Sequence, residues 1–436
     1  MAVIVGMEFR LSIDRNKLDL HNGGKDTFFS SCTMPASLAS KAPMKHWTAL
    51  ILAALLAACT GVPTVQRPDS LYSDHLFSAP SVPIGDGDIF ALSDGMRNYL
   101  NSDVSAQLRG KDRQHALYDA LYSSNQLKLE YDSTITRNAA QAFEARTGNC
   151  LSLVILTAAL AKQLGLSVQY QSVFSIQTMS RSGDLIYYSS HVNLALGNHE
   201  TEGKIVFQAK QPMTIDFLPP DELAGQRSRA IRESTIVAMY LNNRAAETLG
   251  EGKLDDAYWW ARKAIERDPT FLSSYNTLGV IYLRHGNLKE AERILKYIVG
   301  LEPGNPNPIA NLVVVLEKLG RAEESSRWSA TLRKLQVNPP FYFFDLGMRA
   351  MQEHDYRQAR DMFAKELERA AYYHEFHAAL AAAYLGLGDV EQARKHLLVA
   401  IENSTTRADR DLYTAKLASI TPKPQSLLLP ETPRTH

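Results

Sequence analysis

The sequence of 436 residues has few cysteines, no excess of charge of either sign, and no apolar run long enough to span a bilayer. Its three cysteines, Cys32, Cys59 and Cys150, are too few for a disulfide framework. The 47 basic and 47 acidic residues cancel and form no basic stripe, which argues against nucleic-acid binding. The length and the ordinary apolar content predict a soluble globular protein of two or three domains.

The start of the chain reads as a processing signal. Residues 1–43 mix charges, Gly-Gly and serine runs without periodicity, and we interpret them as an upstream extension before a true start at Met44. A charged segment, a short apolar run and the small-residue stretch Leu56–Cys59 then follow in order. Over residues 44–59 this order resembles the signal peptide and lipobox of bacterial lipoproteins. The resemblance implies cleavage before Cys59 and lipidation of that residue.

A lipidated Cys59 would anchor the protein stably, because several acyl chains bind a membrane where one chain does not. By analogy with Gram-negative lipoproteins, Thr60 in place of Asp favours the outer membrane, with the protein facing the periplasm. Residues 60–85 carry four prolines and little periodicity, and are predicted to be a tether. After processing, Cys150 would be the remaining free thiol in an oxidising compartment, which favours a functional role.

Cys150 follows Gly148 and Asn149 and begins an apolar run to Leu164. Leucines recur in this run at helical spacing, and Gly165 follows as a stop, so Cys150 is predicted in the first turn of a buried helix. The dipole and the free N–H groups at that end of a helix favour the reactive thiolate. This position alone leaves open that Cys150 is only a buried core residue.

The region 86–235 is predicted to be an α+β domain. Residues 86–145 are mostly helical in pattern, and after the Cys150 helix the hydrophobic period changes from helix to strand. Helices followed by an antiparallel meander define the α+β class. The predicted strands are residues 168–174, 186–196, 204–209 and 214–217.

A candidate catalytic triad emerges from this layout. His191 lies in the second predicted strand and Asp216 in the fourth. A cysteine nucleophile needs a base to accept its proton, and the base needs a carboxylate to orient its ring. Cys150, His191 and Asp216 are therefore the candidate catalytic residues.

Other residues compete for these roles. His199 is a rival base, although its surroundings read as a hairpin turn, and Asp184 or Glu200 is a rival carboxylate. His191 and Asp216 alternatively have only structural roles, and Asn193 alternatively faces solvent. One cysteine and scattered histidines lack the spacing of metal ligands, so neither a metal nor another cofactor is expected.

The motifs at 148–150, 191–194 and 214–216 resemble, in this order, the transglutaminase-like superfamily of papain-like cysteine folds. The resemblance implies amide acyl transfer or hydrolysis through a thioester, by a protease, an amidase or a cross-linking acyltransferase. Many members carry Trp after the histidine, where this chain has Val192. The backbone N–H of Cys150 is expected to supply half of an oxyanion hole. Candidates for a second, polar donor upstream are Gln107, Gln114 and Gln126.

Residues 236–403 repeat with a period of 34. Small residues recur at that step, as do residues of a turn five positions earlier, where four of the five repeats have glycine and the fourth has His354. A third column is mostly small and is predicted to lie where helices pack closely. This pattern resembles five tetratricopeptide repeats (TPR), a resemblance that implies an all-α superhelical solenoid. The three columns are 257, 291, 325, 359 and 393; 252, 286, 320, 354 and 388; and 245, 279, 313, 347 and 381.

Several features of the repeats bear on function. The third repeat is the weakest and is a candidate hinge, and Asn338–Pro340 marks a break after it. Phe341–Phe344 is predicted to be packing core. Residues 404–436 are predicted to form a capping helix and a disordered tail. The concave groove of such a solenoid binds an extended peptide or a partner helix, so a protein or peptide partner is expected. The alternative function is a catalytically inactive scaffold for envelope protein assembly.

Overall fold

The fold is taken from a computed structural model, and the structure describes residues 2–5, 69–122, 127, 129–132, 135–198, 212–217, 227–404 and 406–421. The predicted extension beyond Val5, the signal peptide with Cys59 and the tail after Thr421 lie outside the described residues. The first contiguous part of the chain, from Asp69, begins with short helical segments, as the sequence predicted for residues 86–145. These are η1 (Asp69–Leu71), η2 (Asp74–Leu76), α2 (Asp94–Tyr99), the π-turn η3 (Leu100–Val104), α3 (Ser105–Gln107), α4 (Arg113–Tyr122) and α5 (Ala139–Ala145).

Helix α6 (Cys150–Gln163) is the core of this first region. Every residue from Leu151 to Ala161 is buried, as expected for a helix that is apolar on all sides. It packs on α4, on α5 and on the sheet. Gly165, with φ of +69°, ends the segment. The predicted buried helix with Cys150 in its first turn is confirmed.

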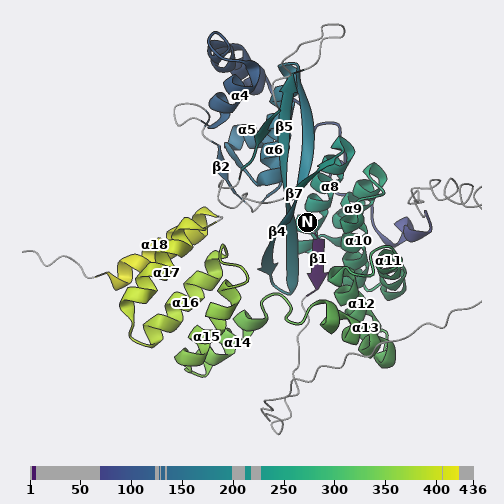
Figure 1. The fold of residues 1–436 in the computed structure, drawn as a ribbon. Helices are drawn as coiled ribbons and strands as arrows, with labels where there is room; N and C mark the ends of the chain where they lie inside the picture. Colours follow the sequence, from purple (N-terminus) through teal and green to yellow (C-terminus); the bar gives the residue numbers. More distant parts are fainter. Residues whose placement is uncertain are drawn as a thin grey trace, which may run out of the picture. The chain divides into compact units, whose positions relative to one another are not determined.

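The sheet is antiparallel, and all of its strands except the first follow α6 in the chain (Figure 1). Its order is β1-β5-β4-β7, and β6 also pairs with β5. A two-residue turn at Gly183 and Asp184 joins the two long strands, β4 and β5. The strands are β1 (Ala2–Val5), β4 (Leu166–Ser182), β5 (Leu185–Asn198), β6 (Met213–Ile215) and β7 (Arg227–Ile231), and a separate parallel pair is formed by β2 (Glu130–Tyr131) and β3 (Thr147–Gly148).

The predicted strands are partly confirmed. The strand predicted at 186–196 is β5, and that at 168–174 is only the first half of β4, which continues to Ser182. The strand predicted at 204–209 lies outside the described residues. The strand predicted at 214–217 corresponds to β6, which ends at Ile215, so Asp216 lies just after the strand and not within it. The strands β1, β2, β3 and β7 have no counterpart in the prediction. The α+β class, with helices before an antiparallel sheet, is confirmed.

In the described part of the chain, five helix pairs follow the sheet, and the second helix of each pair begins 34 residues after that of the pair before. In the column of small residues, Ala257, Ala291, Ala359 and Ala393 are fully buried and Ser325 is nearly so. The capping helix predicted after the repeats is α18 (Arg407–Ile420). The pairs are α8 (Glu233–Gly250) and α9 (Leu254–Arg267), α10 (Leu272–His285) and α11 (Leu288–Leu301), α12 (Pro306–Lys318) and α13 (Ala322–Leu335), α14 (Tyr342–Gln352) and α15 (Tyr356–Leu367), and α16 (His374–Gly386) and α17 (Val390–Glu402).

The glycine column has a backbone cause. Gly252, Gly286, Gly320 and Gly388 all have positive φ, and His354 in the same column has φ of +59°. Each residue ends the first helix of a pair in the left-handed region, which glycine enters without steric cost. The turn therefore accounts for four of the five residues in the column, and His354 adopts the same conformation at a cost.

The stack is interrupted after the third pair. Among the described residues, the close packing that joins other successive pairs is missing between α13 and α14. The hairpin of β4 and β5 reaches the array on both sides of this break. Arg181 pairs with Asp345 of α14 at 2.7 Å and lies over the ring of Phe341, while Asp184 pairs with Arg284 of α10. The sheet thus supplies contacts where the repeats lack them.

The segment from Asp69 to Ser81 is bound to the array. Phe77 stacks on Tyr258 with ring centroids 3.9 Å apart, and Tyr282 donates a hydrogen bond to the carbonyl of Leu71 at 2.9 Å. The Ser81 hydroxyl also donates to Asp256. The described part of the predicted tether at 60–85 is therefore packed on α9, α10 and their neighbours.

Candidate functional site

The turn before α6 is held rigidly. The side-chain oxygen of Asn149 accepts hydrogen bonds from the backbone N–H of Ser152 at 2.9 Å and from its hydroxyl at 2.8 Å. The Ser152 hydroxyl in turn accepts from the N–H of Arg137. A Cβ at Gly148 would lie 2.7 Å from that of Ser152. Gly148 therefore allows a close approach of the backbone to Ser152 within this turn.

His191 and Asp216 form a hydrogen-bonded pair. Pairing of β5 with β6 sets Leu194 opposite Ile215, which carries Asp216 to the side of β5. Nε2 of His191 lies 2.7 Å from Oδ1 of Asp216. Both side chains are largely buried, at 4% and 9% exposed, so water screens the pair little. These two residues, 25 positions apart, thus meet as the triad hypothesis requires.

Asn193 belongs to the same cluster. It lies two residues after His191, and alternate residues of a strand share one face. Its amide donates to Oδ2 of Asp216 at 2.6 Å, so the two carboxylate oxygens are held by two neighbouring side chains of β5. The possibility that Asn193 faces solvent is wrong, since it is 6% exposed. The period of two in the strand was the available signal for this role.

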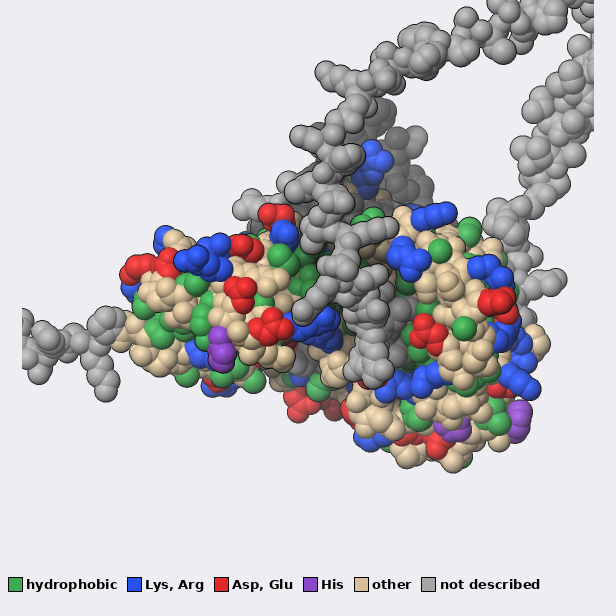
Figure 2. All heavy atoms as spheres, turned by 90° about the horizontal axis from the view of Figure 1, so that it is seen from below, with side chains coloured by type: hydrophobic (Ala, Val, Ile, Leu, Met, Phe, Trp, Pro, Cys, Tyr) green, Lys and Arg blue, Asp and Glu red, His purple; other side chains and the backbone are tan. Residues whose placement is uncertain are grey.

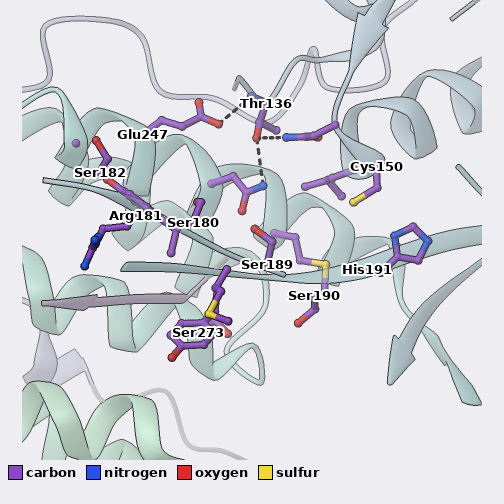
Figure 3. Close-up of a pocket in the computed structure, with 18 of the residues that line it drawn as sticks. Thr136, Cys150, Ser180, Arg181, Ser182, Ser189, Ser190, His191, Glu247 and Ser273 are labelled. Carbon is purple, nitrogen blue, oxygen red and sulfur yellow. Dashed lines mark hydrogen bonds between the residues drawn. The ribbon is translucent and has the colours of Figure 1, made fainter. Parts of the chain in front are cut away.

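Cys150 and His191 lie side by side at one end of a cavity (Figure 3). Burial lowers the pKa of His191, but its hydrogen bonds to Asp216 and to Cys150 outweigh burial and raise that pKa to about 9. Because Nε2 faces Asp216, Nδ1 is the ring nitrogen left for the sulfur. His191 therefore lies between the carboxylate of Asp216 and the sulfur of Cys150, at the start of α6. This arrangement can support nucleophilic chemistry at sulfur.

A break in strand register lies at His191. β4 and β5 pair regularly up to Val173 opposite His191, and pairing then resumes with Gln177 opposite Ser190. Three residues of β4 are thus inserted at this point. Bulges bend a strand and redirect side chains, and they are frequent next to active sites. Nothing in the sequence pattern indicated this bulge.

The structure places some of the alternative candidates for the base, the carboxylate and the oxyanion donor away from these roles. Asp184 lies at the hairpin turn and pairs with Arg284, while His199 and Glu200 lie outside the described residues. Gln114 is 2% exposed and donates to the carbonyl of Leu196 at 2.7 Å, so it holds α4 to β5 and is not free to bind a substrate oxygen. Gln126 also lies outside the described residues, and Gln107 is a partly exposed residue of α3.

Thr136 connects the cysteine turn to the repeat array (Figure 3). Its hydroxyl oxygen accepts from the amides of Asn149, at 2.9 Å, and Asn243 of α8, at 3.1 Å. Its N–H donates to Glu247 of α8 at 2.8 Å. Burial raises the pKa of Glu247, although these contacts oppose the shift. The first helix of the array therefore takes part in positioning the residue that caps the Cys150 helix.

The cavity has a volume of about 1040 Å³ and extends from Cys150 and His191 to the array. It is lined on one side by β4 and β5, and on the other by residues of α8, α10, α12 and α16. Figure 3 shows Glu247, Arg181 and Ser182 at the end away from His191. Among the described residues, no cluster of His, Cys, Asp and Glu could hold a metal ion. This is a space large enough for a peptide.

The surface carries both signs of charge. On the face drawn in Figure 2, basic and acidic side chains are interspersed over the described residues, in keeping with the zero net charge. Within the part of the chain that is described, no helix has the length and apolar character needed to cross a bilayer.

Comparison with known proteins identifies the repeats. Residues 260–293 match the tetratricopeptide repeat family. YrrB, a TPR protein with an unusual peptide-binding site, is 22% identical over 41% of this chain and 92% of its own, with a TM-score of 0.22. MamA is 19% identical over 40% and 94%, with a TM-score of 0.23. TTC0263, a thermophilic TPR protein of Thermus thermophilus, is 17% identical over 42% and 98%, with a TM-score of 0.27.

The family match falls on the second half of α9, α10 and the start of α11, where the 34-residue period places a repeat. Together with the five helix pairs, it confirms that the chain carries tetratricopeptide repeats. A chain of this class presents a helical surface for protein–protein interaction.

Proposed function

We propose that the region around Cys150 is a transglutaminase-like cysteine domain that transfers or hydrolyses amide acyl groups. The observation that carries the proposal is the position of His191, hydrogen-bonded to both Cys150 and Asp216 at the end of a large cavity. A nucleophile, a base and an orienting carboxylate in contact are the minimum for covalent catalysis at sulfur.

The reaction follows from these roles. The Cys150 sulfur, its proton held by His191, attacks an amide carbonyl carbon, and a C–S bond forms. The C–N bond breaks, and the proton on His191 passes to the leaving amine. Water or a second amine then attacks the thioester carbonyl carbon and gives a proton to His191. The C–S bond breaks, and the thiolate of Cys150 is released. Hydrolysis makes the protein a protease or amidase, and aminolysis makes it a cross-linking transferase.

The transition state needs hydrogen-bond donors for its oxyanion. The first N–H groups of a helix have no partner within the helix, and Cys150 is the first residue of α6. Its N–H is therefore our candidate for one donor, placed next to the sulfur that attacks. Asn193 has a separate role as a positioning residue, since it holds the carboxylate that orients His191.

The repeat array binds a protein or peptide partner in this proposal. The cavity is shared between the array and the cysteine region, so a bound chain would contact both. The lipobox resemblance adds that Cys59 is lipidated and holds the protein at the outer membrane, facing the periplasm. Incorporation of labelled palmitate that is lost in Cys59→Ser tests this part separately.

The decisive experiment measures alkylation of Cys150 by iodoacetamide from about pH 4 to about pH 9, with peptide-resolved mass spectrometry. At about pH 6 we expect His191→Ala to react about a hundredfold more slowly than the wild type, because an ordinary thiol is almost entirely protonated there. Asp216→Asn should fall between the two. His115→Ala is the matched control, since His115 is an exposed histidine of α4 and should leave the rate unchanged.

If the wild type and His191→Ala react alike and slowly, Cys150 is a structural thiol. The protein is then a TPR scaffold, and the catalytic proposal is wrong. If the pair is reactive, incubation with peptide amides should trap an acyl group on Cys150, and its release by water or by an added amine distinguishes hydrolase from transferase.

A further inference from the structure

Tyr131 is fixed beside the turn that carries Cys150. Parallel pairing of β2 with β3 sets Tyr131 opposite Gly148, which lies two residues before Cys150 in the chain. The N–H of the next residue, Asp132, donates to the carbonyl of Gly148 at 3.1 Å. Tyr131 and Cys150 both line the cavity. The backbone thus holds this tyrosine in a set position relative to the candidate nucleophile.

Ile135 is held against the same turn by the residues that follow it. The hydroxyl of Thr136 accepts from the side-chain amide of Asn149 at 2.9 Å, and the N–H of Arg137 donates to the hydroxyl of Ser152 at 2.8 Å. Ile135 lines the cavity and is 46% exposed. It therefore offers apolar surface that a molecule bound at the candidate site can bury.

The segments that flank Cys150 present uncharged side chains to the cavity. Among the described residues of 131–137, those that line it are Tyr131, Ile135 and Thr136, and the neighbours of Cys150 in the chain that line it are Asn149 and Leu151. The two charged residues of the first segment, Asp132 and Arg137, pair with each other at 3.4 Å and do not line the cavity.

The charged residues of the cavity wall belong to other elements, namely β4, α8 with the residue after it, α16 and α18. They are Arg181, Arg244, Glu247, Glu251, Glu375 and Asp409. Glu247 reaches the segment beside the cysteine turn, but one of its carboxylate oxygens accepts from the N–H of Thr136 and the other from Arg244. A charged substrate group between Tyr131 and Ile135 would therefore lose its water without gaining a partner from the flanking segments.

We propose that Tyr131 and Ile135 form an apolar subsite, which takes an uncharged, apolar side chain of the substrate next to the amide under attack. The proposal rests on the proposed acyl transfer and names its substrate class, a peptide or protein amide beside a residue such as leucine. Because both residues are tied to the turn of Cys150, binding of the apolar side chain would also place the amide carbonyl at the sulfur.

The test compares two alkylating reagents of nearly equal size on the full chain, iodoacetyl-leucine amide and iodoacetyl-asparagine amide. Both carry the same reactive group, and peptide-resolved mass spectrometry at about pH 7 follows each at Cys150. After correction for their rates with free cysteine, we expect the leucine reagent to react about tenfold faster with the wild type. Ile135→Ser should bring this ratio down to about one to two. Since the ratio is taken within one protein, a change in the reactivity of the sulfur itself cancels.

Two further variants control this experiment. Ile135→Leu keeps an apolar side chain and should keep the preference for the leucine reagent. Leu398→Ser is the matched control, because Leu398 is an exposed residue of α17 that does not line the cavity, and it should keep the preference as well. Equal corrected rates of the two reagents with the wild type overturn the proposal. A preference for the leucine reagent that survives in Ile135→Ser overturns it too.

The same measurements separate the subsite from the acyl-transfer mechanism. If Cys150 reacts as slowly as an ordinary thiol and yet prefers the leucine reagent through Ile135, the subsite stands and the catalytic proposal fails. If Cys150 reacts fast in a way that depends on His191 but shows no preference, the catalytic proposal stands and the subsite is wrong. Absence of any reaction between Cys150 and the leucine reagent also overturns the subsite.

Discussion

The repeat array and the cysteine region differ in how far apart in the sequence their contacting residues lie. In the array, each helix pair packs on the next, so the residues that define a repeat recur every 34 positions and can be read locally. In the cysteine region, Cys150, His191 and Asp216 come from a helix, a strand and the end of another strand. Apart from the break after α13, each helix pair of the array thus packs on its neighbours in the chain, whereas each contact at the site joins residues far apart in the chain.

The two regions are nevertheless joined. Thr136 links the cap of α6 to α8, and the β4–β5 hairpin contacts the array on both sides of the break after α13. We therefore expect substitutions at the site to change stability in a pH-dependent way. Substitutions in the repeats should change stability according to the steric clash that they create or remove.

The largest expected effect is the pH dependence of the His191 pair. The hydrogen bonds of His191 raise its pKa to about 9, despite burial, from about 6.5 in an unfolded chain. A raised pKa stabilises the folded state fully below about pH 6.5, and this contribution is lost as pH rises through about 9. The shift corresponds to about 3 kcal/mol.

Urea denaturation of the wild type and His191→Gln checks this prediction. The difference in their free energies of unfolding should shrink by about 3 kcal/mol between about pH 6 and about pH 10. His115→Gln should follow the wild type across the range. A difference that stays constant with pH would show that His191 does not hold its proton through Asp216 and Cys150.

The next effect is steric and lies in the array. A Cβ at Gly347 would lie 2.5 Å from the ring of Phe363, so Gly347→Ala should destabilise the protein by about 1–3 kcal/mol. Gly300 of α11 has nothing within 4 Å of the same position, so Gly300→Ala should be neutral or stabilising by up to about 1 kcal/mol. Thermal unfolding compares the two, and equal effects would contradict the close helix contact at Gly347.

A smaller effect is expected where the regions meet. Thr136→Val keeps the shape of the side chain but leaves the amides of Asn149 and Asn243 without their acceptor, at a cost of about 1–2 kcal/mol. We expect slower alkylation of Cys150 as well, because Asn149 caps its helix. Thr136→Ser keeps the hydroxyl and should behave like the wild type in both assays. A loss of stability without any change in the alkylation rate would show that the contacts of Thr136 with the array do not influence the reactivity of Cys150.

The smallest effect concerns the turn column of the repeats. His354 holds φ of +59°, which favours glycine, so His354→Gly should raise the free energy of unfolding by about 0.5–1 kcal/mol. The exposed contact of its Nδ1 with the Tyr356 hydroxyl offsets little of this gain. Gly388→His is the reciprocal change and should destabilise the protein by a similar amount. If both variants lower the melting temperature, the column is not set by backbone conformation.

Prediction from sequence was most successful where the determinants are local. The turn glycines, the buried small residues and the capping helix follow from one helix packing on the next, and the cap and stop of α6 follow from Asn149 and Gly165. The strands β1 and β7, the second half of β4 and the true end of β6 were missed. Those strand limits depend on partners far along the chain, which a pattern of period two does not contain.

The sequence by itself determined the 34-residue period of the repeats, the buried helix that begins at Cys150 and the candidates for a triad, because each rests on spacing along the chain. Only the tertiary structure decided that His191 lies between Cys150 and Asp216, that Asn193 holds the same carboxylate, and that Gln114 is committed to β5. It also decided the bulge at His191 and the role of Thr136 between the two regions. The physical reason is that these contacts join residues far apart in the chain, whose distances arise only when the sheet and the helices pack.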